Sequence, residues 1–261
     1  MGAKVLAIAN QKGGVGKTTT VASLAGLLAS QNKRVLLIDT DPHASLTSYL
    51  DYDSDLLDGT LFDLFGQEAP GRQQVERVIL QTRFANICLI PASIALSTLD
   101  RTLGDRDGMG LILRRALQHI QDLFDVVLID CPPVLGVMMV NALAASSRIL
   151  VPVQTEFLAL KGLERMIKTF EIMQHSSQLP FHYTIIPTMF DKRTKASVQS
   201  LETVRELYGQ RVWDSVIPID TKFRDASHLH VPPSIYAPES RGSQAYLSLL
   251  GYLLQQEGRT S

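Results

Sequence analysis

The sequence lacks the long apolar run, the leader and the cysteine framework that mark several special classes of protein. No apolar stretch approaches the ~20 residues that a membrane-spanning helix needs, so we expect no transmembrane segment. Met1 is followed directly by a strand-like segment, without a basic region, apolar run and cleavage site, which predicts no signal peptide. Cys88 and Cys131 lie far apart without metal-ligand spacing, and we interpret them as reduced thiols.

A strong net charge is also missing. The chain carries 25 Lys and Arg against 26 Asp and Glu, a formal net charge of -1. A protein that binds polyanions over its whole surface is usually basic, so any nucleic-acid binding must come from a local patch. With 261 residues, 45% of them hydrophobic, the chain can bury the core of an ordinary globular protein.

Short apolar runs alternate with amphipathic stretches along the chain. The runs are rich in Val, Ile and Leu, as in parallel strands covered on both faces. The expected strands are Val5–Ala9, Val35–Ile38, Ile87–Ile90, Val126–Ile129, Ile149–Val153 and Tyr183–Ile186. The expected helices are Thr18–Ser30, Gly108–Gln121, Glu156–His175, Ala196–Tyr208 and Arg241–Gln256. This alternation predicts an α/β fold with a doubly wound, mostly parallel β-sheet and helices on both faces. We interpret Asp51–Gly59 as a surface loop and expect one domain over residues 1–261.

The segment Gln11–Thr18 is a glycine-rich turn between an expected strand and an expected helix, which is the context of a P-loop. Glycines let successive backbone N–H groups converge, and these donors bind phosphate oxygens at a helix N-terminus. We expect Lys17 to reach the β- and γ-phosphates of a nucleotide and the Thr18 hydroxyl to bind Mg²⁺. The usual pattern begins with Gly, where this chain has Gln11. The expected nucleotide contacts in this region are Gly13, Gly14, Val15, Gly16, Lys17, Thr18 and Thr19.

Two other expected strands end in carboxylates. Asp39 and Asp41 follow one of them, and Asp130 follows another. The carboxyl ends of parallel strands face the crevice where ligands bind, and alternate residues of an extended chain face the same side. An Asp after an apolar strand is typical of a Walker B site, which contacts Mg²⁺ directly or through water.

A second lysine, Lys12, begins the run Lys-Gly-Gly-Val-Gly-Lys-Thr, which resembles the deviant Walker A motif of the ParA/MinD family of P-loop ATPases. The resemblance covers nearly the whole chain. It includes Asp39–His43, similar to switch I but with His43 in place of the common Gln, and Asp130–Pro133, similar to switch II. It implies a P-loop NTPase fold and a Mg²⁺-dependent hydrolysis of ATP that is slow without a partner.

The family resemblance also implies roles for individual residues. Lys12 would reach the nucleotide of the partner subunit in an ATP-bridged homodimer. Asp41 would position or activate the attacking water, and Asp39 would support the Mg²⁺ and phosphate region. The expected catalytic residues are Lys12, Lys17 and Asp41, and the expected metal-site residues are Thr18, Asp39 and Asp130.

Several features resemble the ParA/Soj branch more than the MinD branch. Gln11 is common in ParA-like chains, whereas MinD-like and FlhG-like chains generally carry Gly there. The segment Tyr246–Gln256 lacks the basic polar face of a membrane-targeting helix, so we expect no stable membrane anchor. Ile217–Asp220 resembles the loop over the adenine base, which adds Pro218 and Asp220 to the expected nucleotide contacts.

ParA-like ATPases bind DNA without sequence preference as ATP dimers, through phosphate contacts by Lys and Arg. Arg193 and Lys222 match the DNA-contacting positions of the family, and Arg224 lies near them in sequence. Ile219 stands where some relatives carry Arg. The resemblance implies a cytoplasmic, nucleoid-associated switch whose hydrolysis, stimulated by a ParB-like or cargo-adaptor protein, partitions a chromosome or plasmid or positions a protein array. The segment Asp41–Leu50 resembles the subgroup that positions chemoreceptor arrays.

Four alternatives stay open. The chain could be a MinD/FlhG-like, membrane-associated positioning ATPase, or a metabolic ATP-dependent ligase on the same fold, although no insertion for a second substrate is obvious. It could be an electron-transfer ATPase, but neither cysteine matches a position that binds an iron–sulfur cluster. It could also be a nucleotide-binding module without turnover.

Overall fold

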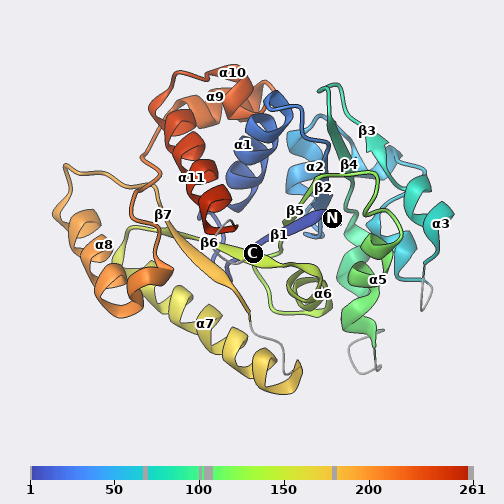
Figure 1. Ribbon diagram of the computed structural model, residues 1–261, viewed down its shortest axis with the longest axis horizontal. Helices are drawn as coiled ribbons and strands as arrows, with labels where there is room; N and C mark the ends of the chain where they lie inside the picture. Colours follow the sequence, from blue (N-terminus) through green and yellow to red (C-terminus); the bar gives the residue numbers. More distant parts are fainter. Residues whose placement is uncertain (1, 67–69, 100–101, 103–107, 178–180, 258–261) are drawn as a thin grey trace.

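A seven-stranded sheet organises the computed structural model, which describes residues 2–66, 70–99, 102, 108–177 and 181–257 (Figure 1). The strand order is β3-β4-β2-β5-β1-β6-β7, and every pair is parallel except β3 with β4. The strands are β1 (Lys4–Ile8), β2 (Val35–Asp39), β3 (Leu80–Gln81), β4 (Ile87–Ile90), β5 (Val126–Asp130), β6 (Arg148–Gln154) and β7 (Tyr183–Thr188). The prediction of a doubly wound, mostly parallel sheet is confirmed.

Helices cover both faces of this sheet, as Figure 1 shows. The helices are α1 (Lys17–Ser30), α2 (Ser45–Tyr49), α3 (Arg72–Arg77), α5 (Ile112–Gln118), α6 (Val137–Ala145), α7 (Phe157–Ser177), α8 (Lys195–Tyr208), α9 (Lys222–His228), α10 (Pro233–Tyr236) and α11 (Arg241–Glu257). Short 3₁₀ turns occupy Ser54–Leu56, Leu61–Leu64, Ile94–Thr98, Met109–Leu111 and Gly209–Arg211. One core cluster joins the sheet to α1, α2 and α11, and a second joins it to α5, α6 and α7. Each buried strand therefore contributes alternate side chains to two separate cores.

The strand register brings the ends of three central strands together. β5 lies between β1 and β2, and in this register Asp130 is level with both Ile8 and Asp39. The loops that follow these strands therefore leave the same edge of the sheet side by side. This edge is where a parallel α/β sheet binds its ligands.

Several local expectations needed refinement. The expected helix Gly108–Gln121 is a 3₁₀ turn followed by α5, and the loop Asp51–Gly59 contains the 3₁₀ turn at Ser54–Leu56.

Cys88 and Cys131 are free and buried, as interpreted. Helix α11 packs into the core, where Tyr246 is 1% exposed. Within the described ranges, no helix is both long and apolar enough to cross a membrane.

Candidate nucleotide-binding site

The glycine-rich turn between β1 and α1 forms an open cradle. Gly14 and Gly16 have φ values of 73° and 92°, in the left-handed region that side chains disfavour. A Cβ placed on Gly13, Gly14 or Gly16 would meet nothing within 4 Å, so the turn borders open space. A hydrogen bond joins this turn to the end of β7: the Thr188 hydroxyl donates to the carbonyl oxygen of Val15 at 2.9 Å. Such a turn at the N-terminus of a 14-residue helix can bind phosphate.

The two lysines of the cradle lie in different environments. Lys17 is 8% exposed, and its Nζ donates a long, 3.3 Å hydrogen bond to the carbonyl oxygen of Lys12. A buried ammonium in so weak a bond fits a site completed by an anionic ligand. The Lys12 Nζ instead forms an ion pair with Oε1 of Glu156, immediately before α7. Lys17 is thus bonded to the loop itself, whereas Lys12 is paired with a residue outside the loop.

Two buried carboxylates lie behind the cradle. Oδ2 of Asp130 accepts a 2.6 Å hydrogen bond from the Thr18 hydroxyl, while its Oδ1 is buried and has no partner among the described residues. Oδ2 of Asp39 accepts hydrogen bonds from the Thr47 backbone and hydroxyl, both at 2.8 Å, and Oδ1 accepts one from the Asp41 backbone at 3.1 Å. Asp39 is therefore held by its neighbours, whereas Asp130 keeps one oxygen available for a ligand.

The oxygens of Thr18 and Asp130 fit Mg²⁺, which prefers hard oxygen ligands. The orphaned Oδ1 of Asp130 is the observation that fits such an ion best. In the part of the chain that the structure describes, no group of three or more His, Cys, Asp or Glu could hold a metal ion. Mg²⁺ characteristically keeps waters and takes further oxygens from substrate phosphates, so this sparse protein set is sufficient.

Burial changes the protonation of both acids. It raises the pKa of Asp39 to about 6, and burial together with the nearby Asp39 raises that of Asp130 to about 8. The folded, nucleotide-free protein therefore binds a proton in the Asp39–Asp130 pair that the unfolded chain releases. The stabilisation is complete below the ordinary carboxyl pKa and is lost as the pH rises through about 8.

This linkage gives a test without Mg²⁺ or nucleotide. The free energy of unfolding should fall from weakly acidic pH towards pH 8, by at most about 1.4 kcal/mol per pH unit for one proton. Asp130→Asn, which is neutral at every pH, should flatten the dependence in thermal unfolding followed by circular dichroism. Asp191→Asn is the matched control, because Arg193 lowers the pKa of Asp191 to about 2, outside this range. An unchanged slope in Asp130→Asn would exclude Asp130 as its source.

Asp41 lies beside this pair at the end of β2. Its side chain is 13% exposed, and its Oδ1 accepts a 3.0 Å hydrogen bond from the His43 backbone. The Nδ1 of His43 lies 2.9 Å from the same oxygen, while the His43 side chain is 80% exposed. His43 thus holds the Asp41 carboxylate through both its backbone and its ring.

A cavity of about 680 Å³ continues from the cradle and could hold a nucleoside. The predicted contacts Thr19, Pro218 and Asp220 all line it, next to Val15 and Gly16. Residues that the sequence analysis missed complete its wall; they include Gln154, Met189, Phe223, Ser227, His228 and Tyr246. Arg224, expected on the DNA-binding surface, also lines this cavity. Arg224 is also an exposed residue, so its place on the DNA-binding surface stays a prediction.

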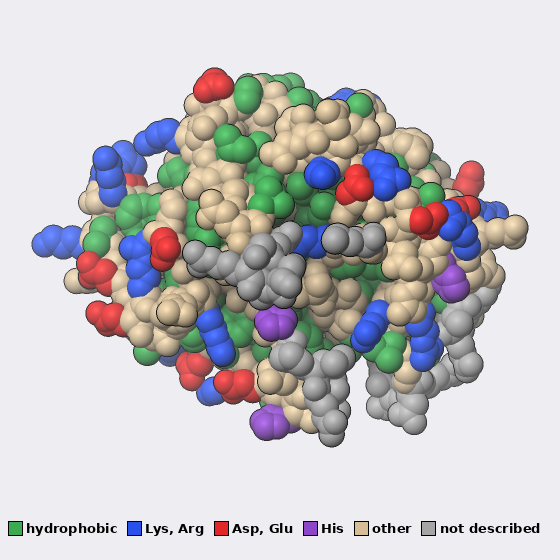
Figure 2. Space-filling model, viewed as in Figure 1, with side chains coloured by type: hydrophobic (Ala, Val, Ile, Leu, Met, Phe, Trp, Pro, Cys, Tyr) green, Lys and Arg blue, Asp and Glu red, His purple; other side chains and the backbone are tan. Residues whose placement is uncertain are grey.

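The two other expected DNA-binding residues lie on the surface, and each is paired with a carboxylate. Arg193 is 81% exposed and lies 2.7 Å from Asp191, and Lys222 lies 3.1 Å from Asp225. The visible face of the molecule carries interspersed Lys, Arg, Asp and Glu side chains (Figure 2). DNA binding by Arg193 or Lys222 would therefore have to compete with these local ion pairs.

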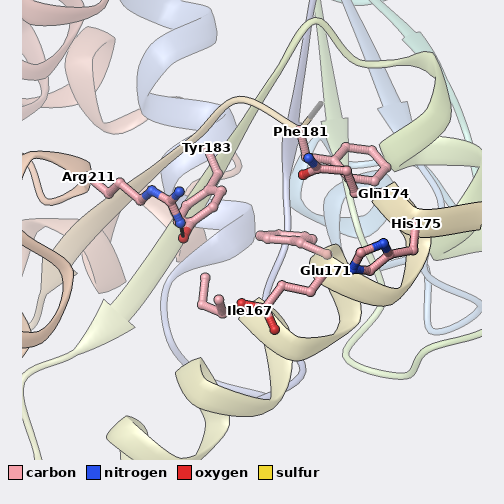
Figure 3. Close-up of a pocket in the computed structure, with 8 residues that line it drawn as sticks. Ile167, Glu171, Gln174, His175, Phe181, Tyr183 and Arg211 are labelled. Atoms are coloured by element: carbon pink, nitrogen blue, oxygen red, sulfur yellow. Dashed lines mark hydrogen bonds between the residues drawn. The ribbon is translucent and has the colours of Figure 1, made fainter. Parts of the chain in front are cut away.

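Another hollow, of about 480 Å³, lies at the amino end of β7, the end remote from the cradle (Figure 3). Phe170, Phe181 and Tyr183 contribute aromatic rings, and the Arg211 guanidinium stacks 4.7 Å from the centroid of the Tyr183 ring. None of the P-loop residues lines this hollow. It is therefore no part of the nucleotide site.

Comparisons with known proteins agree with this geometry. The model of a family described as an AAA domain matches residues 3–182. The chain is 36% identical to the sporulation initiation inhibitor protein Soj of Bacillus subtilis over 94% of this chain and 96% of that protein. It is 38% identical to the chromosome partitioning protein ParA of Caulobacter vibrioides over 97% and 95%. A crystal structure described as cobyrinic acid a,c-diamide synthase from Mycobacterium smegmatis, with bound ADP and magnesium, superposes with a TM-score of 0.84 at 34% identity, covering 99% of this chain and 97% of that one.

Proposed function

The chain belongs to the ParA/Soj family of Mg²⁺-dependent P-loop ATPases, and on this premise we propose that it is a dimerising switch that positions cargo. In its ATP state it forms a homodimer and binds DNA non-specifically; hydrolysis, stimulated by a ParB-like or cargo-adaptor protein, releases it. The cargo is a chromosome, a plasmid or a protein array such as chemoreceptors. The proposed setting is the cytoplasm, at the nucleoid.

One observation carries the proposal: of the two lysines of the loop, Lys17 bonds to the loop itself and Lys12 pairs with Glu156 outside it. Lys17 lies at the cradle, 8% exposed, as a lysine that neutralises the nucleotide of its own subunit should. The Lys12 side chain pairs with Glu156 and is 30% exposed, so it is accessible to a second copy. A lysine that acts across a dimer interface requires this accessibility.

The side chains have complementary roles in the proposed reaction. Lys17 and the loop amides neutralise the phosphates, and Lys12 of the second subunit adds a charge where negative charge develops. Asp41 orients the attacking water, held in place by His43. Thr18 and Asp130 would hold Mg²⁺, with Asp39 fixed by Thr47 at the neighbouring strand end, and the bound ion would neutralise part of the phosphate charge.

The proposed DNA-binding surface consists of Arg193 and Lys222. Both are exposed, and each can exchange a carboxylate for a DNA phosphate when the dimer places two copies of the surface side by side. Ile219 is 48% exposed nearby and adds no charge. Binding should therefore be weak per subunit and depend on dimerisation.

The test is retention on non-specific duplex DNA with AMP-PNP, which is not hydrolysed, and with ADP, at two salt concentrations. We expect retention with AMP-PNP that weakens with salt and little with ADP. Arg193→Glu combined with Lys222→Glu should lower the affinity by about 100-fold or more, since four contacts per dimer are reversed in sign. Lys168→Glu is the matched control, because Lys168 is an exposed, ion-paired lysine on α7.

Two results would count against this assignment. An equal loss in Lys168→Glu would show a general charge effect rather than a surface at Arg193 and Lys222. No retention under any condition, with ATP dimers still present, would favour a membrane or a protein scaffold as the surface on which the switch moves. The membrane alternative has little support, because the apolar side of α11 is already packed in the core.

A metabolic ligase is the second candidate, favoured by the similarity to the structure described as cobyrinic acid a,c-diamide synthase. Such an enzyme must bind an acceptor acid beside the γ-phosphate. The cavity of about 680 Å³ next to the cradle is of a size that the nucleoside itself would occupy. ATP turnover that increases with cobyrinic acid and an ammonia donor, and yields an amide, would favour the ligase over the switch.

A further inference from the structure

We propose that Glu156 is a positioning residue for Lys12, holding the Lys12 ammonium in its own subunit until the nucleotide of a second subunit replaces the carboxylate. The inference rests on the proposed function, because it assumes that Lys12 acts across an ATP dimer. If Glu156 has this role, it lowers the affinity of the ATP-bound dimer and so raises the ATP concentration at which the chain dimerises.

Hydrogen bonds and close packing fix the backbone at Lys12, on one side of the ion pair with Glu156. The backbone N–H of Lys12 donates a 2.9 Å hydrogen bond to Oδ1 of Asn10, and Nδ2 of Asn10 donates a 2.7 Å hydrogen bond to the carbonyl oxygen of Pro152 in β6. The start of the loop is thereby fixed to the strand that leads to Glu156. A Cβ placed on Gly162 of α7 would lie 3.6 Å from Cβ of Lys12, so the lysine stem passes close to the backbone of α7.

Glu156 itself is fixed through its backbone. Its N–H donates a 2.8 Å hydrogen bond to the carbonyl oxygen of Gln154, and its carbonyl oxygen accepts one from Ala159 at 3.0 Å, in the first turn of α7. The side chain is 41% exposed. Replacing the carboxylate should therefore leave the fold intact and change the charge that faces Lys12.

The surroundings of the pair suit a second copy of the chain. Phe157 and Leu158, directly after Glu156, are 70% and 66% exposed, which is unusual for adjacent large apolar side chains. On the other side of the pair, the Lys12 carbonyl oxygen accepts the hydrogen bond from Lys17, the residue that follows the cradle glycines. Lys12 thus bridges the phosphate cradle and an exposed apolar surface that a second subunit could cover.

A partly exposed ion pair is easily exchanged. Pairs of this exposure contribute little, so a carboxylate can be displaced by the more highly charged phosphates of ATP. The ion pair should therefore weaken the dimer without preventing its formation. The strength of the ion pair, and with it this effect, should fall as the salt concentration rises. A symmetric dimer breaks two such pairs, so their effects multiply.

The experiment measures the dimer dissociation constant by analytical ultracentrifugation with Mg²⁺ and AMP-PNP, at low and moderate salt. At low salt Glu156→Gln should tighten the dimer by up to about fivefold per subunit, or about 25-fold in total. The difference from the wild type should shrink at moderate salt. Glu156→Asp keeps the carboxylate and should stay nearer the wild type, and Glu164→Gln, which breaks the exposed pair with Lys168 on the same helix, is the matched control. The affinity of the monomer for ADP should not change.

Other results would contradict either the proposed function or the role of Glu156. If the wild type forms no dimer with AMP-PNP, the proposed function fails and this inference fails with it. If the wild type dimerises and Glu156→Gln matches it, or dimerises less well, the holding role of Glu156 is wrong while the proposed function stands. A gain that is equal at both salt concentrations, or that also occurs in Glu164→Gln, would likewise overturn the role of the ion pair.

Discussion

Replacing Lys17 by alanine is expected to weaken ATP binding by about 100-fold or more. Lys17 is the first residue of α1, directly after the cradle glycines, and is 8% exposed. Hydrogen bonds from a charged donor contribute about 1.5–3 kcal/mol each, and more where water is excluded. Two such bonds to the β- and γ-phosphates account for a loss of this size.

The loss should be confined to nucleotide binding. Without nucleotide, Lys17 is a nearly buried ammonium whose hydrogen bond to Lys12 is long, so its removal should not lower the thermal midpoint of the free protein. Isothermal titration calorimetry with Mg²⁺ and ATP, together with thermal unfolding, separates binding from folding. Lys33→Ala, an exposed lysine in the turn after α1, is the control. An ATP affinity close to that of the wild type would remove Lys17 from the phosphate site.

The central part of the fold could be predicted because its signals are local. Strands such as Val35–Asp39 are buried at every residue, which leaves an unbroken apolar run in the sequence. The P-loop is equally local, since its glycines, its lysine and its helix are contiguous. The elements that were missed lack such signals. β3 has two residues, and α6 is apolar on nearly every side, so it shows no amphipathic period.

The site was predictable where the chain itself carries the motif, and not where distant segments complete it. Thr47, which fixes Asp39, lies in α2, and nothing in its local sequence marks it as a partner. Phe223 and Tyr246 reach the nucleoside cavity from α9 and α11, more than 200 residues after the P-loop. Glu156 is the first residue of an expected helix, but its pairing with Lys12 requires the approach of α7 to the cradle. Such contacts follow from tertiary packing rather than from residue spacing.

Asp41→Asn is expected to lower ATP turnover by about 100-fold to 10,000-fold, the range for loss of a positioned acid–base group. The substitution keeps the shape of the side chain and removes its charge and basicity. It should not weaken ATP binding, because Asp41 is a negative charge near the expected phosphates and its removal reduces repulsion. The protein should therefore accumulate as an ATP-bound dimer.

His43 supplies a graded comparison for the Asp41 substitution. Its Nδ1 lies 2.9 Å from Oδ1 of Asp41, but the side chain is 80% exposed, and the His43 backbone holds the same oxygen at 3.0 Å. His43→Ala should therefore slow turnover far less than Asp41→Asn, since the backbone contact remains. Phosphate release and the dimer fraction, measured on the same samples, distinguish the possibilities. Turnover near the wild-type rate in Asp41→Asn would exclude Asp41 from orienting water, whereas a loss of turnover together with a loss of dimer would make Asp41 part of the dimerising site rather than the group that acts on water.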